Sequence, residues 1–206
     1  MIIKEVKTTA KKTFAPGLYD LTELQRDANK RFGYSAKETL NIMQRLYESH
    51  KVLTYPRTDS RYITTDVADT LKERLKACSV GPYRKLAGSL SMRPIRKNAS
   101  FVDNKKVTDH HAIIPTEQFV DLQTMTNEER KVYDLVVRRF LAVLLPAFEY
   151  DQTVFTGGLA GESFTAKGKI VKSQGWKEAY ENLKRMKNGK KRTIWQRHRK
   201  NRRYRP

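Results

Sequence analysis

A tyrosine followed by proline and arginine, Thr54-Tyr55-Pro56-Arg57, is the stretch whose residue types and spacing best suit chemistry. Proline fixes its own φ and pushes the residue before it towards extended backbone, so we expect Tyr55 outside any helix. Arg57 and Arg61 follow the tyrosine at positions +2 and +6. Cations placed there could hold a phosphate and stabilise a phenolate, which a tyrosine nucleophile acting on a phosphodiester needs.

On this stretch alone, Tyr55 has two interpretations. A phenol stays protonated at neutral pH, so a nucleophilic tyrosine needs a base or strongly positive surroundings. The two arginines would supply that positive charge, but Tyr-Pro-Arg by itself favours a structural tyrosine. The structural interpretation is a half-buried tyrosine at the end of a strand predicted over Val52–Tyr55.

Two adjacent histidines lie in a second segment, TDHHAIIPT, at residues 108–116. Paired histidines in a loop raise the question of a metal site, since imidazole is a common zinc ligand. No third ligand follows at a spacing typical of such a site, so we assign no metal ligand to the chain. From the residues alone, the other interpretation is a histidine that makes local structural hydrogen bonds.

The composition predicts a polyanionic partner. The 206 residues carry 42 lysines and arginines against 22 acids, a formal charge of +20, which suits nucleic acid. The last 24 residues, 183–206, hold 12 of the basic residues and no acid, so the preceding part is moderately basic, at +8. Two interpretations of this tail are a disordered nucleic-acid-binding segment and translation past a frameshift.

Other classes of protein fit the sequence poorly. The lone cysteine, Cys78, rules out an internal disulfide and a cysteine-rich zinc site, and we expect it in the core. No apolar run is long enough to span a bilayer, and the N-terminus lacks the apolar core of a signal peptide. We therefore expect a cytoplasmic protein without a membrane partner.

Four helices are expected to position the two segments. Capping signals and apolar spacing predict helices over 20–33 and 35–49, the second with an inner stripe of Leu40, Met43, Leu46 and Tyr47. Further helices are expected over 65–78 and from 126 to the residue before Pro146. Residues 79–107 are expected to be mainly loop, with one short helix around 82–87. Alternating apolar residues then predict a β-hairpin, with strands over 148–156 and 163–171.

The stretch LTYPRTDSRY resembles the active-site segment of type IA DNA topoisomerases, closest to the topoisomerase III branch. The helices before it, LYDLTELQRDANKRFGYSAKETLNIMQRLYE, and the motif His-x-Ala-Ile-x-Pro-Thr after it are similar to segments of the same family. The resemblance covers roughly residues 14–180. His111 stands where many relatives carry glutamate, at a position that varies in the topoisomerase III branch.

The resemblance implies a fold that is mainly α with β segments. It implies the end of a β-rich arch at 1–14, a winged-helix-like helical domain carrying the tyrosine at 15–145, and a β-hairpin of the arch at 146–182. The basic tail at 183–206 lies outside the resemblance, and we expect it to be disordered.

The resemblance also implies a reaction and its residues. Tyr55 would attack single-stranded DNA and form a 5′-phosphotyrosyl link; strand passage and religation would follow without ATP. Arg57 would pair with the phosphate, and His110 would lie near it. The expected DNA contacts are Arg57, Thr58, Asp59, Ser60, Arg61, His111 and Thr116.

One half of the family's site is expected to lie elsewhere. In the family, Mg²⁺ binds a glutamate and an Asp-x-Asp motif of a Toprim domain, and this chain has no Asp-x-Asp. We therefore expect a topoisomerase fragment, with a separate Toprim-containing polypeptide as a candidate partner.

Two other classes of DNA-binding protein share some of these features. A non-catalytic module for single-stranded DNA would use the same basic and aromatic residues. A tyrosine recombinase also combines a tyrosine with arginine and histidine, but its tyrosine comes last in the chain, whereas Tyr55 precedes His110.

Overall fold

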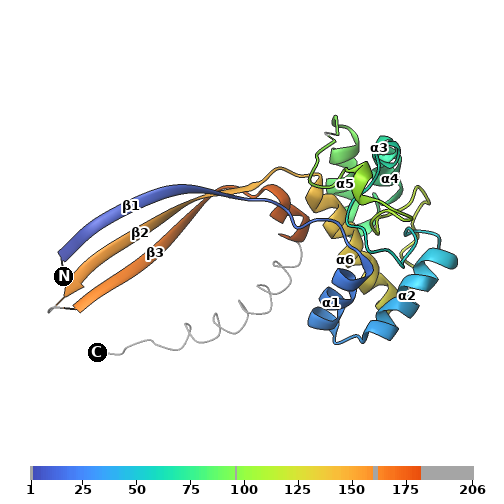
Figure 1. The fold of residues 1–206 in the computed structure, drawn as a ribbon, viewed down its shortest axis with the longest axis horizontal. Helices are drawn as coiled ribbons and strands as arrows, with labels where there is room; N and C mark the ends of the chain where they lie inside the picture. The colour runs from blue at the N-terminus through green and yellow to red at the C-terminus, as the bar shows by residue number, and fades with distance from the viewer. Residues whose placement is uncertain (1, 96, 160–161, 182–206) are drawn as a thin grey trace, which may run out of the picture.

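The structure, a computed structural model, describes residues 2–95, 97–159 and 162–181. It has two regions (Figure 1): a helical body, and a long three-stranded sheet that extends away from it. Helices and a small antiparallel sheet together confirm the predicted fold class. The predicted tail at 183–206 lies outside the described residues.

Two capped helices open the body. Helix α1 spans Leu21–Phe32; the Asp20 side chain accepts a hydrogen bond from the Glu23 amide at its start, and Gly33 ends it in the left-handed conformation, with φ of 76°. Helix α2 spans Ala36–Glu48 and begins with a capping box between Ser35 and Glu38. Both predicted helices are confirmed.

The middle of the body is more broken than predicted. The helix expected over 65–78 is two short helices, α3 at Thr65–Asp69 and α4 at Leu71–Ala77, which are separated at Thr70. Helix α5 follows at Arg84–Ser91. Cys78, at the end of α4, is fully buried as expected.

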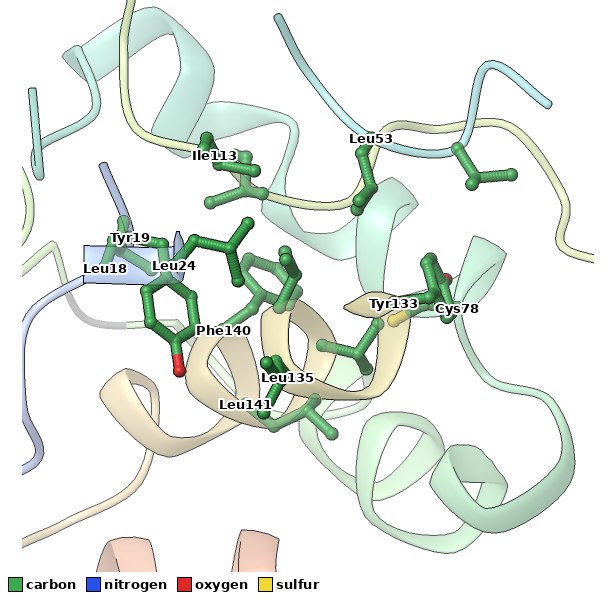
Figure 2. Close-up of a cluster of buried hydrophobic side chains, with 14 of the residues drawn as sticks. Leu18, Tyr19, Leu24, Leu53, Cys78, Ile113, Tyr133, Leu135, Phe140 and Leu141 are labelled. Carbon is green, nitrogen blue, oxygen red and sulfur yellow. The ribbon is translucent and has the colours of Figure 1, made fainter. Parts of the chain in front are cut away.

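Helix α6, at Asn127–Val143, is the central helix of the core. It too begins with a capping box, between Thr126 and Glu129. Figure 2 shows side chains from distant segments gathered around it, among them Leu18, Leu53, Cys78 and Ile113. The core therefore joins both predicted site segments to the same helix.

The sheet is antiparallel, in the order β1-β2-β3. Its strands are β1 at Ile2–Thr13, β2 at Phe148–Leu159 and β3 at Glu162–Ser173. The predicted hairpin is confirmed, and its strands are longer than expected; β2 also pairs with β1 along its length. No helix among the described residues is long and apolar enough to cross a bilayer.

A short 3-10 turn, Gly175–Tyr180, connects the sheet to the body. The Trp176 indole donates a hydrogen bond to the Thr13 carbonyl at the end of β1, at 2.9 Å. Arg138 of α6 donates one to the Ala179 carbonyl, at 2.7 Å. The turn is thus hydrogen-bonded to both regions.

Candidate active site

Tyr55 is half-buried and lies between two other rings. Its ring is tilted by 36° against the His110 imidazole, with 4.2 Å between the ring centroids. Tyr47, in the last turn of α2, meets the same ring edge-on at 5.5 Å, a favoured geometry for aromatic pairs. The structure therefore places two predicted catalytic residues, Tyr55 and His110, side by side.

Backbone pairing brings these two residues together. The Thr54 amide donates to the Ile114 carbonyl at 3.0 Å, and the Thr116 amide donates to the Val52 carbonyl at 3.1 Å. The Thr54 hydroxyl also donates to the Ala112 carbonyl at 3.1 Å. The strand predicted over Val52–Tyr55 is wrong as a regular strand. What forms is an isolated bridge between Leu53 and Pro115, and a proline has no amide hydrogen with which to continue a ladder.

The loop after Tyr55 is held by buried hydroxyl groups. Thr58 donates from its hydroxyl to the His110 carbonyl at 2.9 Å, and its oxygen accepts from the Ser60 amide at 3.1 Å. The Ser60 hydroxyl donates to the Lys106 carbonyl at 2.7 Å. Both side chains are buried. These predicted DNA contacts are therefore engaged in fixing the loop against the histidine segment.

The charged side chains of this loop differ in whether they have a partner within the described part of the chain. Arg57 and Asp59 are exposed, and within the described part of the chain neither side chain forms a hydrogen bond or an ion pair. Arg61 is half-buried and donates from Nε to the Leu18 carbonyl at 3.1 Å. The Arg57 guanidinium, two residues from Tyr55, is thus available to bind an anion.

The two histidines have different environments. His110 is exposed, whereas His111 is half-buried and its Nδ1 lies 2.8 Å from the Ala112 carbonyl. A carbonyl only accepts, so this Nδ1 carries the proton. Burial lowers the pKa of His111, which favours its neutral form.

Thr116, another predicted DNA contact, donates its hydroxyl within the chain, to the Lys51 carbonyl at 2.6 Å.

A metal site is a separate question. Among the residues that the structure describes, His, Cys, Asp and Glu form no group of three that could hold a metal ion. The residues present therefore do not fit the Mg²⁺ that the family resemblance implies.

Sequence reasoning missed two features of the site. Tyr47 was expected in the inner stripe of its helix, but it is 37% exposed and packs on Tyr55 instead of the core. Lys106 places its ammonium 4.4 Å from the centre of the Tyr62 ring and donates to the Tyr62 hydroxyl at 3.3 Å. That hydrogen bond raises the pKa of Lys106. Tyr47 and Tyr55 lie eight residues apart, one in a helix and one after it, so no sequence periodicity predicts their contact.

Known proteins resemble this chain over most of its length. A family profile described as DNA topoisomerase matches residues 1–203. The DNA topoisomerase 3 of Bacillus anthracis is 64% identical over 180 residues, which is 87% of this chain and 25% of that relative. The DNA topoisomerase 3 of Bacillus subtilis (strain 168) is 56% identical over the same shares. The chain thus spans about a quarter of the length of these relatives.

A solved structure supports the fold. Full-length topoisomerase I from Thermotoga maritima matches with a TM-score of 0.62 and 24% identity, over 87% of this chain and 29% of that one. At this identity, the likeness concerns the fold alone. The family profile covers far more than half of the chain, and we conclude that the chain belongs to the type IA DNA topoisomerase family.

Proposed function

We propose that this chain carries the DNA-cleaving tyrosine of a type IA topoisomerase of the topoisomerase III kind. In the proposed reaction, the Tyr55 oxygen attacks a phosphodiester of single-stranded DNA and forms a 5′-phosphotyrosyl bond. The bond to the 3′ oxygen breaks, and that oxygen leaves as a hydroxyl. Attack by the same hydroxyl reverses the link, so the reaction conserves the phosphodiester and needs no ATP.

The observation that carries this proposal is the stack of Tyr55 on His110 at 4.2 Å beside an exposed Arg57 that has no partner among the described residues. A guanidinium matches the non-bridging oxygens of a phosphate in shape and charge. An arginine placed there would position the phosphate and stabilise charge that develops on it. His110 would hydrogen-bond near the same phosphate.

The remaining predicted contacts have different proposed roles. Asp59 and His111 stay candidates for contact with DNA near the phosphate. Three hydroxyls already donate within the chain, those of Thr58, Ser60 and Thr116. We propose that these residues shape the loop and affect DNA binding indirectly, by positioning their neighbours. Arg61, which donates one hydrogen bond to Leu18, keeps further donors for a phosphate.

We propose that the Mg²⁺ ligands of the complete site come from a Toprim region outside the described residues. Two facts support this: no metal-binding group lies in the described part, and the chain spans a quarter of its relatives' length. No step assigned here to Tyr55, Arg57 or His110 passes through the metal.

Covalent trapping tests the proposal. The chain is incubated with end-labelled single-stranded DNA and Mg²⁺, alone and with a purified Toprim-containing fragment, and is then denatured. With the Toprim fragment present, we expect a label linked to the protein. Tyr55→Phe should abolish this label, whereas Tyr62→Phe, which changes a neighbouring tyrosine of the same loop, should retain it. A label that persists in Tyr55→Phe would contradict the assignment.

A second function, a DNA-binding module without cleavage, is favoured by the same lack of a metal-binding group among the described residues. It expects salt-sensitive DNA binding that is equal in the wild type and Tyr55→Phe, and no label even with the Toprim fragment. The trapping experiment therefore separates the two functions.

A further inference from the structure

The two faces of the sheet differ in how their lysines are paired. Side chains alternate between faces along a strand, and residues directly opposite in neighbouring strands share a face. The observed register places Lys7, Val154 and Lys167 in one row across the sheet. Thr9, Gln152 and Lys169 form the next row on the same face, and Lys11, Tyr150 and Val171 the one after it.

We name this surface the lysine face and define it by four exposed lysines among the described side chains, Lys7, Lys11, Lys167 and Lys169. Rows on one face are about 7 Å apart along the strands, so these cations span about 14 Å. Among the described side chains, the one acid on this face is Glu5, and no ion pair joins it to a lysine. The face therefore carries a net positive charge.

The two lysines described on the opposite face, Lys12 and Lys172, are neutralised. Lys12 lies directly across from Glu149 and pairs with it at 2.8 Å. Lys172, beside the irregularity in β3, pairs with Asp151 at 3.1 Å. We name this surface the paired face. The two faces thus carry the same kind of residue in two electrostatic states.

The aromatic residues of the lysine face are themselves covered by ammonium groups. Lys169 lies 3.7 Å from the centre of the Tyr150 ring and 4.5 Å from that of Phe148. Lys177 lies 3.4 Å from the centre of the Phe148 ring. Rings covered in this way do not offer a platform on which bases could stack. The surface therefore presents positive charge more than stacking area.

We propose that the lysine face is a second DNA-binding surface, separate from Tyr55, that contacts the phosphodiester backbone. Charge complementarity identifies the ligand, since a ladder of cations without acidic partners and without open rings suits phosphates and not bases. The inference rests on the proposed function in taking DNA as the polyanion. It does not depend on cleavage at Tyr55.

Matched double variants test the proposal in the full chain. Lys7→Gln/Lys167→Gln removes two charges from the lysine face, one from β1 and one from β3. Lys12→Gln/Lys172→Gln removes the same charges from the same strands on the paired face. DNA affinity is measured by fluorescence anisotropy across a salt series, with labelled single-stranded and duplex oligonucleotides, after circular dichroism has shown equal folding.

The lysine-face variant is expected to lower the slope of log K against log salt by about 1.4 for single strands or about 1.8 for duplex. The paired-face variant is expected to change the slope by less than half as much. A quadruple variant should lower the slope by about 3; it carries Lys→Gln at positions 7, 11, 167 and 169. Equal slopes for the two double variants, with both forms of DNA, would overturn the proposal.

A mapping experiment shows directly where DNA binds. The chain is acetylated with acetic anhydride, with and without DNA, and each lysine is quantified by peptide mass spectrometry. Protection of Lys7, Lys11, Lys167 and Lys169, with no change at Lys12 and Lys172, is expected; equal labelling of both faces would contradict it. Tyr55→Phe should show the same protection, so loss of the covalent adduct and loss of this surface are separate results.

Discussion

The helical body and the sheet are stabilised in different ways. The body gathers residues from distant segments into a closed core, in which Phe140 is 1% exposed. Within the part of the chain that the structure describes, the sheet has no such cover: Phe155 on β2 is 37% exposed and Ile170 on β3 is 62% exposed. The body therefore depends on tertiary packing, whereas the sheet depends on its backbone ladder.

This difference assigns the two regions different tasks. The Tyr55–His110 stack needs two segments held together at a fixed distance, which a packed core can do. The sheet offers a surface on which alternation and register sort the charges. We expect changes in the body to affect stability and the site together, and changes in the sheet to affect mainly its surface.

The largest expected contrast is between two phenylalanines. Phe140→Ala should lower the free energy of unfolding by about 3–5 kcal/mol, because it leaves a cavity in the core. Phe155→Ala, a matched change on the exposed sheet, should cost less than about 1 kcal/mol. Urea denaturation followed by circular dichroism measures both. Equal losses would mean that the sheet is packed as tightly as the body.

The connection between the regions gives the next effect. Gly175 has φ of 45°, and a Cβ there would overlap the Ala147 carbonyl. Gly175→Ala should therefore cost about 3 kcal/mol, since backbone must move. At Gly33 a Cβ meets open space, so Gly33→Ala should cost only about 1 kcal/mol from the positive φ. Thermal unfolding compares them, and a milder effect at Gly175 would argue against a rigid connection.

A buried carboxylate provides a smaller contrast. Glu129 at the start of α6 accepts hydrogen bonds from Arg45 Nε at 2.7 Å and the Thr126 amide at 2.9 Å, with His50 at 3.2 Å. Glu129→Gln should cost about 2 kcal/mol, because charge-assisted bonds are lost at a buried site. Glu149→Gln, which breaks the exposed pair with Lys12, should cost about 0.5 kcal/mol or less. Urea denaturation of the two variants compares these losses.

The same residue predicts a pH dependence. Burial opposes ionisation of Glu129, but the hydrogen bonds from Arg45, Thr126 and His50 outweigh it and lower its pKa below the ordinary 4.5. Its stabilising contribution is therefore complete above that value and is lost as the pH falls through the lower folded pKa. Between neutral pH and acid, the wild type should lose more stability than Glu129→Gln. Parallel pH profiles would contradict this.

The smallest expected effect concerns Tyr47, whose ring packs on that of Tyr55. Tyr47→Ala should lower the free energy of unfolding by about 1 kcal/mol through loss of the edge-on contact with Tyr55. Tyr47→Phe keeps the ring and should stay within about 0.5 kcal/mol of the wild type. A double-mutant cycle with Tyr55→Ala measures the coupling directly. No coupling would mean that the two rings do not support each other.

Local signals in the sequence predicted the helices well. The capping boxes at Ser35 and Thr126 marked helix starts to within a residue, because a cap is a contact between near neighbours. The hairpin was equally visible in its alternation. The break at Thr70 was not predicted, since the apolar spacing runs continuously across it.

The site was predicted in part, for the same reason. Proline placed Tyr55 outside a helix, and the family resemblance named His110. The stack between them depends on pairing of residues 52–54 with 112–116, which local periodicity does not encode. Tyr47 was missed because apolar spacing assigned it to the core. The lysine face follows from the strand register, which the sequence alone did not supply.

The central claim, that Tyr55 is the nucleophile, is tested most directly by locating the bond to DNA. Adduct formed with the Toprim fragment is digested with nuclease and trypsin, and the peptides are analysed by mass spectrometry. Trypsin should release residues 52–57, which contain one tyrosine, Tyr55. We predict a nucleotide linked through its 5′ phosphate on that peptide. A nucleotide on another tyrosine, or a 3′ linkage, would contradict the account.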